Sequence, residues 1–277
     1  MRFASIGSGS QGNGTLIDNG SAGTILLDCG FSAREARARL EAKGLQASDL
    51  AGILVTHEHG DHVKGVATLA NALRIPVYAT WGTYQAALSG RLEQSLFQCI
   101  DQSSRFELAG LTVQAVAVLH DAREPCQFVV AGPAGRLGIL SDTGAFNRQM
   151  VAAYRGCDAL LLECNHDLRM LAEGPYPAQL KRRVAGHYGH LNNEQAADFL
   201  RQVAHPGIQH LVATHISQKN NTAALALAAF ATVELGPDCR VGAACQGNGF
   251  DWLSLRPAVS GALPSRSGQL MLDLQTQ

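Results

Sequence analysis

Short apolar runs broken by glycine-rich turns occupy the first fifth of the chain and predict β-strands. They cover residues 2–6, 15–18 and 24–28. A polar, glycine-rich stretch at 7–14 separates the first two. A further buried strand is expected over 52–56, and it runs directly into the polar segment 57–62. These closely spaced strands favour a sheet built from the start of the chain.

Helical patterns follow these strands. Ser32, three residues before Glu35, has the spacing of a capping box and predicts a helix over 33–43 that Gly44 ends. Two more helices, from 62 to about 74 and from about 80 to 88, are expected on either side of a short strand at 76–79. Later helices are expected over 192–203 and 222–233.

The middle of the chain again favours strands, at 105–108, 111–119, 127–130 and 137–141. Buried strands are also expected at 159–163 and 211–214. Two similar halves of this kind predict sheets packed together with helices outside. We expect one domain over 1–255. The Ser-, Gly- and Pro-rich tail 256–277 is expected to pack loosely, with 270–274 as a segment that could dock.

The composition is typical of a compact protein. Of 277 residues, 46% are hydrophobic and 16% are charged, with a net charge of −1. No global positive field attracts nucleic acid, so a nucleic-acid substrate would need a local basic patch. The start of the chain lacks a signal-peptide pattern, and the most apolar stretch, 223–233, is too short to cross a bilayer. Seven scattered cysteines without a CxxC pair favour reduced thiols, a cytoplasmic location and no membrane partner.

The segment 57–62 carries the clearest chemistry. Three imidazoles and a carboxylate stand within six residues, at His57, His59, Asp61 and His62. Imidazole and carboxylate are natural ligands of zinc and manganese, and a loop at a strand end lets several of them point into one space. The sequence therefore predicts a metal site rather than a polar turn.

This pattern resembles the HxHxDH motif of the metallo-β-lactamase fold. The resemblance implies an α/β protein, an αββα four-layer sandwich of two mixed β-sheets flanked by helices. It also implies further motif residues, each just after an expected strand: Asp28, His120, Asp142 and His215.

By the same resemblance, two divalent ions, zinc or manganese, would share these ligands. His57, His59 and His120 would hold one ion. Asp61, which is also assigned a catalytic role, would hold the second with His62 and His215. Asp142 would bridge the two, and Asp28 would orient the metal loop without binding metal.

Three details favour a subgroup. The carboxylate at 142 argues against antibiotic-degrading members, which carry Cys or Ser there. The segment 214–217, THIS, resembles a motif of ribonuclease Z, and the upstream segment 189–192 makes His190 the implied proton donor. The segments 7–13, 120–125, 161–167, 175–177, 180–183 and 217–221 are similar to bacterial proteins of the YycJ/WalJ type. That group implies a metal-dependent 5′ to 3′ exonuclease acting on DNA.

Other candidate substrate contacts are supported by fewer features of the sequence than the metal ligands are. His166 either touches phosphate or caps the following helix, and both alternatives stay open. Lys181, Arg182 and Arg183, with His187 nearby, form either a phosphate-binding edge or an ordinary solvated helix face. The 7–14 loop lacks the GK[ST] ending of a P-loop and is expected to wall the site instead.

The alternative functions use the same residues. A small-molecule hydrolase, such as a cyclic phosphodiesterase, lactonase or thioesterase, would need the same metal ligands. A non-catalytic binding module is a third possibility, against which the complete ligand set argues. The fold by itself does not separate these chemistries.

Overall fold

The computed structural model describes residues 1–257. The predicted tail 256–277, with its docking segment 270–274, lies outside the described residues from 258 onward. None of the helices in residues 1–257 combines the length and apolar character needed to cross a membrane.

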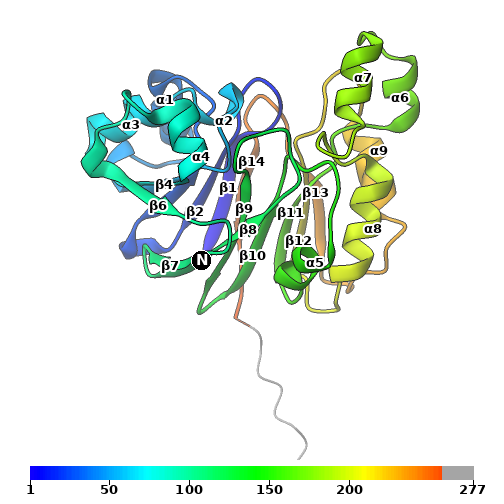
Figure 1. The fold of residues 1–277 in the computed structure, drawn as a ribbon. Coiled ribbons are helices and arrows are strands. Elements are labelled where there is room, and N and C mark those ends of the chain that lie inside the picture. Colours follow the sequence, from blue (N-terminus) through cyan, green and yellow to red (C-terminus); the bar gives the residue numbers. More distant parts are fainter. Residues whose placement is uncertain (258–277) are drawn as a thin grey trace, which may run out of the picture.

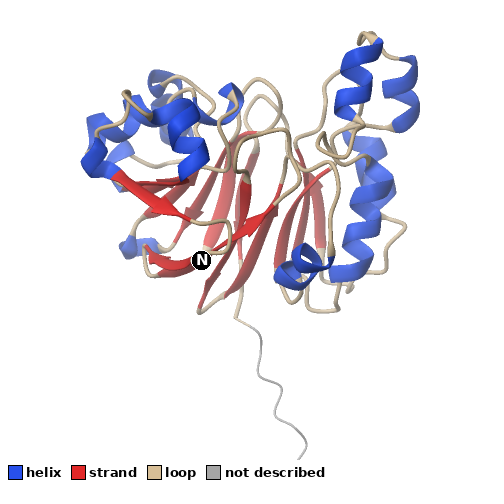
Figure 2. Cartoon of the chain, viewed as in Figure 1, coloured by secondary structure: helices blue, strands red, loops and turns tan. Residues whose placement is uncertain are grey.

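Two seven-stranded sheets pack face to face, with helices on both outer faces (Figure 1, Figure 2). The first has the order β14-β1-β2-β3-β4-β5-β6, and the second β13-β12-β11-β10-β9-β8-β7. Each mixes parallel and antiparallel pairs, such as antiparallel β2–β3 beside parallel β3–β4. The expected four-layer αββα architecture is therefore confirmed. The strands are β1 (Arg2–Gly7), β2 (Gly14–Asp18), β3 (Thr24–Leu27), β4 (Leu50–Leu54), β5 (Val77–Thr80), β6 (Phe97–Ile100), β7 (Arg105–Leu108), β8 (Leu111–Ala117), β9 (Cys126–Gly132), β10 (Gly135–Leu140), β11 (Ala159–Glu163), β12 (His210–Thr214), β13 (Arg240–Ala243) and β14 (Phe250–Ser254).

Successive side chains along the strands point to opposite faces of the sheets, and this alternation builds three apolar layers. In β11, Leu161 packs between the sheets, whereas Leu160 and Leu162 face the outer helices of the second sheet. The longer helices are α1 (Ala33–Ala42), α3 (Val66–Leu73), α5 (Arg148–Tyr154), α6 (Leu168–Glu173), α7 (Ala178–Val184), α8 (Asn193–Val203) and α9 (Ala223–Phe230). The shorter ones are α2 (Gly60–Val63), α4 (Trp81–Thr83), the 3₁₀ turns η1 (Gly20–Ala22), η2 (Ala47–Asp49) and η4 (Gln94–Leu96), and the π-helical η3 (Tyr84–Leu88).

The helix starts follow their predicted caps only in part. The Ser32 side chain accepts a hydrogen bond from the backbone N–H of Glu35, as expected for an N-cap. The Glu35 carboxylate instead pairs with Arg39 one turn later, so we find half of the predicted capping box. Asn192 caps α8 and forms a complete box with Gln195.

Two predictions of secondary structure were wrong in detail. The helix expected over 62–74 is divided into α2 and α3 at Gly65, where a Cβ would lie 2.2 Å from the carbonyl oxygen of Phe31. Strands β6, β13 and β14 were missed. All three are sheet edges with mostly exposed or half-buried side chains, so they lack the apolar pattern of a central strand.

Candidate metal centre and active site

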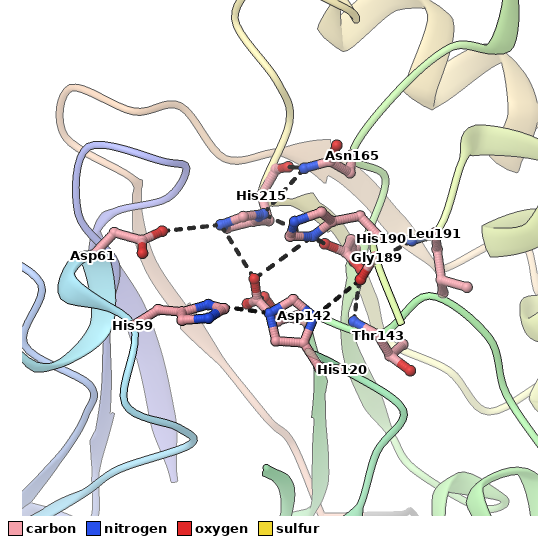
Figure 3. Close-up of polar contacts among 12 residues, drawn as sticks. His59, Asp61, His120, Asp142, Thr143, Asn165, Gly189, His190, Leu191 and His215 are labelled. Carbon is pink, nitrogen blue, oxygen red and sulfur yellow. Dashed lines mark hydrogen bonds and ion pairs between the residues drawn. The ribbon is translucent and has the colours of Figure 1, made fainter. Parts of the chain in front are cut away.

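The predicted metal ligands meet at one edge of the two sheets, beyond the carboxyl ends of their strands. His57 lies three residues after β4, His120 three residues after β8, Asp142 two residues after β10, and His215 directly after β12. Strands β10, β11 and β12 are parallel to one another, so their carboxyl ends reach the same edge. Residues far apart in sequence are thereby brought into one cluster (Figure 3).

Three imidazoles form the first group. His57 Nε2 lies 3.0 Å from His59 Nδ1, and His120 Nε2 lies 3.3 Å from the same atom. These nitrogens belong to a set whose ligand atoms all lie within 4.8 Å of one another. Three ring nitrogens turned toward one point match the donor set that zinc takes from histidine.

Asp61, His62 and His215 form the second group, with Asp142 beside it. Asp61 Oδ2 lies 3.6 Å from His62 Nε2 and 3.7 Å from His215 Nε2. Asp142 lies 3.4 Å from His62 Nε2 and 3.6 Å from His215 Nε2, and it also clusters with His57 of the first group. This carboxylate thus stands between the two groups, where a bridging ligand would have to be.

Hydrogen bonds to the far ring nitrogens turn the near nitrogens toward the cluster. The Asp28 carboxylate accepts from His62 Nδ1 at 2.7 Å, and the carbonyl of Gly189 accepts from His120 Nδ1 at 3.0 Å. His57 Nδ1 donates to Thr56 Oγ1 at 2.9 Å, since that hydroxyl itself donates to Asp28. Such partners fix the tautomer of a metal-binding histidine. Asp28 belongs to neither ligand group and has the contacts of an orienting residue.

The backbone is turned sharply at three of these positions. Asp28, Asp142 and His215 have φ values of 60°, 50° and 52°, in the left-handed region that residues with a side chain rarely adopt. Among the described residues, the other non-glycine examples are Arg74 and Ala109. Each turn ends a strand and redirects a side chain into the cluster, a form of strain that concentrates at functional sites.

Burial and charge divide the histidines into two kinds. Burial lowers the pKa of His57 well below its usual value and also lowers that of His120, so both are neutral and ready to bind a cation. Burial opposes protonation of His62 too, but Asp142 and Asp28 outweigh it and raise its pKa to about 9. His215 likewise has a raised pKa, chiefly through Asp142 against the effect of burial. These carboxylates make the second group attractive to any cation, proton or metal.

The buried atom His215 Nε2 has no hydrogen-bond partner within residues 1–257. A buried donor or acceptor without a partner is costly, so this atom calls for a ligand that the protein itself does not provide. Together with the nitrogen- and oxygen-rich donor sets, it shows that the residues fit divalent metal ions.

Glu163, the last residue of β11, is the main residue that the sequence analysis missed. Its Oε1 lies 2.7 Å from His190 Nδ1 and 3.4 Å from His215 Nδ1, and its Oε2 accepts from the backbone of Thr143 and Leu191. Burial would raise its pKa, but His190 and the hydrogen bonds lower it to about 2. A charged residue ending an otherwise apolar strand was the signal that could have revealed it.

His190 lies against the metal groups. Its ring stacks on that of His215 with centroids 5.3 Å apart, and its Nδ1 lies 3.6 Å from Asp142. With Nδ1 facing Glu163, the remaining nitrogen Nε2 is available to a substrate. The side chain is 18% exposed, so solvent reaches it.

His166 lies inside the protein and not on the surface that a substrate would contact. It is fully buried, and neither ring nitrogen has a hydrogen-bond partner in the described part of the chain. Burial lowers its pKa to about 4. The capping alternative is wrong, because Asp167 accepts the hydrogen bond from Met170 that caps α6. A phosphate contact would require this ring to become accessible.

The predicted basic residues lie on α7, which with α6 rises beyond the sheet edge (Figure 1). Lys181 donates to the carbonyl of Ala172 at the end of α6, and Arg183 pairs with Asp121, the neighbour of His120. Arg182 is exposed and has no ion pair within residues 1–257. The three therefore differ in how free they are to meet a substrate.

The 7–14 loop walls the site, as expected. Ser8 Oγ accepts from the backbone N–H of His215 at 2.8 Å. Asn13 Nδ2 lies 3.0 Å from His62 Nε2 and 3.3 Å from the carbonyl oxygen of Asp61. Asn13 is a further site residue that the sequence analysis did not single out.

Comparisons with known proteins agree with this geometry. A model of the β-lactamase superfamily domain matches residues 23–216. The chain is 34% identical over 230 residues to exodeoxyribonuclease YycJ of Bacillus anthracis, covering 82% of this chain and 86% of that protein. It is 29% identical over 230 residues to exodeoxyribonuclease WalJ of Streptococcus pneumoniae, covering 82% and 85%. The metallo-β-lactamase fold protein YhfI of Bacillus subtilis shares the fold, with a TM-score of 0.67 at 15% identity over 91% of this chain and 98% of YhfI.

Proposed function

Because the chain belongs to the β-lactamase superfamily, we propose that it is a metal-dependent exodeoxyribonuclease of the YycJ/WalJ type, which degrades DNA from 5′ to 3′. The observation that carries this proposal is the pairing of two ligand groups around Asp142 with a histidine, His190, beside them. Hydrolysis of a phosphodiester needs charge stabilisation at phosphorus and a proton for the leaving oxygen, and this arrangement supplies both.

We assign two ions to the seven ligands predicted from the sequence. His57, His59 and His120 would hold one, and Asp61, His62 and His215 the other, with Asp142 between them. When bound, the ions would supply Lewis acidity for activating water and for offsetting phosphate charge. Five histidines favour zinc, whereas the two aspartates also suit manganese.

The protein's own residues perform the remaining steps. Asp28 and Gly189 orient His62 and His120 through their Nδ1 atoms. Glu163 holds His190 by Nδ1, which turns Nε2 toward the leaving oxygen as proton donor. Asp61 keeps its charge because His215 lowers its pKa against the effect of burial.

Substrate would reach the centre along α7. We propose that Lys181, Arg182 and Arg183 face the phosphate backbone, with Arg182 the freest of them, and that His166 supports this side of the site from within. The seven cysteines are all free thiols, which supports a reducing compartment and therefore the cytoplasm.

The test is a nuclease assay after metal removal and reconstitution with zinc or manganese. We expect two ions per chain by elemental analysis. Duplex DNA labelled at the 5′ end should release its label as a short product, and duplex DNA labelled at the 3′ end should shorten stepwise. Asp142→Ala should bind fewer ions and lose most activity while remaining folded. Single-stranded DNA, RNA and bis-p-nitrophenyl phosphate complete the substrate panel. Hydrolysis of the small ester with no attack on any polynucleotide would favour the small-molecule alternative instead.

A further inference from the structure

Tyr188 is an exposed aromatic side chain two residues from His190. It is 58% exposed, although a tyrosine ring normally buries much of its apolar surface. Within residues 1–257 the other large hydrophobic side chains that are exposed are Trp81, Leu168, Leu225 and Val241. Tyr188 is the one whose backbone contacts the loops of the metal centre.

The backbone around Tyr188 is held between two ligand-bearing loops. Its carbonyl accepts from the N–H of Asp121, next to His120, at 3.0 Å. The following carbonyl, that of Gly189, accepts from the His120 ring itself. On the other side, the segment 186–189 lies so close to Gly144 that a Cβ there would meet Gly186 and Gly189 at 2.4 Å. The backbone that carries this exposed ring is therefore held firmly beside the site.

Basic residues lie close to Tyr188 along the chain, and one of them shares a partner with it. Arg183 binds Asp121, whose N–H holds the Tyr188 carbonyl, and Arg182 is the exposed neighbour of Arg183 on α7. His187 packs against Tyr188 edge to face, with ring centroids 5.5 Å apart. Exposed aromatic rings and basic side chains on the same surface are the combination with which proteins hold unpaired nucleobases and follow the phosphate backbone.

The direction of the reaction decides which base meets this ring. In the proposed hydrolysis, water supplies the oxygen that bonds to phosphorus, the P–O3′ bond breaks, and the departing 3′-oxygen takes a proton from His190. That oxygen belongs to the nucleotide that leaves, so its sugar and base lie on the His190 side. Of the exposed aromatic residues Trp81 and Tyr188, Tyr188 is the one near His190 in the chain, and its carbonyl accepts from the N–H next to His120.

We propose that Tyr188 is the stacking platform for the base of the departing 5′-terminal nucleotide. The inference rests on the proposed function and adds a subsite to it. It also implies that the terminal base leaves its pair before cleavage, because a ring stacks on the face of a base only once that face is free.

The kinetic test compares DNA with an ordinary 5′-terminal nucleotide and DNA with an abasic one. For the reconstituted wild-type enzyme, kcat/KM should fall roughly 5- to 100-fold on the abasic end, the range expected for one stacking contact. Tyr188→Ala should show that loss on ordinary DNA and little further loss on the abasic end, whereas Tyr188→Phe should behave as wild type. Trp81→Ala, which removes a ring of equal exposure elsewhere, is the matched control.

A binding measurement without turnover gives a second readout. In chelator, 2-aminopurine at the 5′ end should be quenched by the wild-type chain and by Tyr188→Phe, but not by Tyr188→Ala. The proposal is overturned if the abasic end lowers kcat/KM by the same factor in the wild type and in Tyr188→Ala. It is also overturned if Trp81→Ala and Tyr188→Ala lose equal activity on ordinary DNA. If the wild-type enzyme leaves DNA intact while its fold and metal content are normal, the proposed function itself fails.

Discussion

At the scale of single residues, the site depends on partners that hold several of its histidines by the outer nitrogen. Asp28, Glu163 and the Gly189 carbonyl each meet an Nδ1 atom and leave Nε2 to the site. Motif reading located the histidines but not these partners, apart from Asp28. The partners matter because an imidazole has one lone pair to offer, and its tautomer decides where that pair points.

The first prediction concerns His190 and Glu163. His190→Ala should slow hydrolysis of DNA by ~10²–10⁴, the usual loss for a general acid, and should have far less effect on bis-p-nitrophenyl phosphate, whose leaving group needs no proton. Glu163→Gln should lose ~10–100-fold on DNA. Because Glu163 acts largely through His190, the double variant at saturating metal should be scarcely slower than His190→Ala. If the losses of the two single variants multiply in the double variant, Glu163 acts separately from His190, for example through His215.

The second prediction uses His166. Its pKa of about 4 means that the folded chain keeps it neutral, whereas the unfolded chain protonates it below about 6.5. Stability is therefore lost as pH falls from 6.5 toward 4, by up to about 3 kcal/mol at 1.36 kcal/mol per pKa unit. His166→Leu should reduce the loss of unfolding free energy between pH 7 and pH 5 by about 2 kcal/mol, measured in urea on the metal-free protein. The loss that comes from His57 and His120, whose pKa values burial also lowers, should remain. The exposed His187, replaced in the same way, is the control and should leave the wild-type loss in place. An identical loss in His166→Leu would show that this histidine is not the titrating group.

At the scale of elements, strand ends and the loops that follow them place the ligands. The left-handed turns at Asp28, Asp142 and His215 end β3, β10 and β12 and direct each side chain to the shared edge. Apolar patterning predicted these central strands well, because they are buried on both faces. It failed at the edge strands β6, β13 and β14, whose exposed positions carry no such pattern.

The third prediction tests the contact between two of these loops. Gly144→Ala should cost about 1–3 kcal/mol of unfolding free energy, because its Cβ would collide with Gly186 and Gly189 at 2.4 Å. Activity should fall as well, since the segment it displaces carries His190. Gly242→Ala on β13 is the control, with no atom within 4 Å of the added Cβ. Urea unfolding and DNA hydrolysis measure the two effects, and a Gly144→Ala protein as stable and active as the control would contradict the contact.

At the scale of the whole molecule, charge is nearly balanced. A net charge of −1 attracts no polyanion, so DNA binding has to come from a local surface. The α6–α7 pair rises beyond the edge of the sheets (Figure 1), and α7 carries three consecutive cations. Within residues 1–257, two of them have partners and Arg182 has no ion pair. Binding should therefore depend on few phosphate contacts.

The fourth prediction follows from the small number of phosphate contacts expected on α7. Arg182→Gln should weaken DNA binding and lower the slope of log K against log salt by about one unit, as for one lost phosphate contact. Replacing Lys181 and Arg183 as well should lower the slope further, but by less than one unit each, because both already have partners. Arg34→Gln, an exposed cation on α1, is the control. A salt series by fluorescence anisotropy measures the slopes, and an unchanged slope in the triple variant would make this edge an ordinary solvated face.

The sequence by itself determined the fold class and the candidate metal ligands. The strands and the segment 57–62 are local patterns, and the family resemblance added the candidates His120, Asp142 and His215, with Asp28 as the orienting residue. A buried strand needs an apolar run, and a chelating loop needs its imidazoles and carboxylate within a few residues of its end, as at 57–62. The tertiary structure alone decided which side chains share the site without a motif of their own. Glu163, Asn13 and the Gly189 carbonyl reach the centre from other strands and loops. Their roles depend on distances across the sandwich, and no spacing along the chain encodes those.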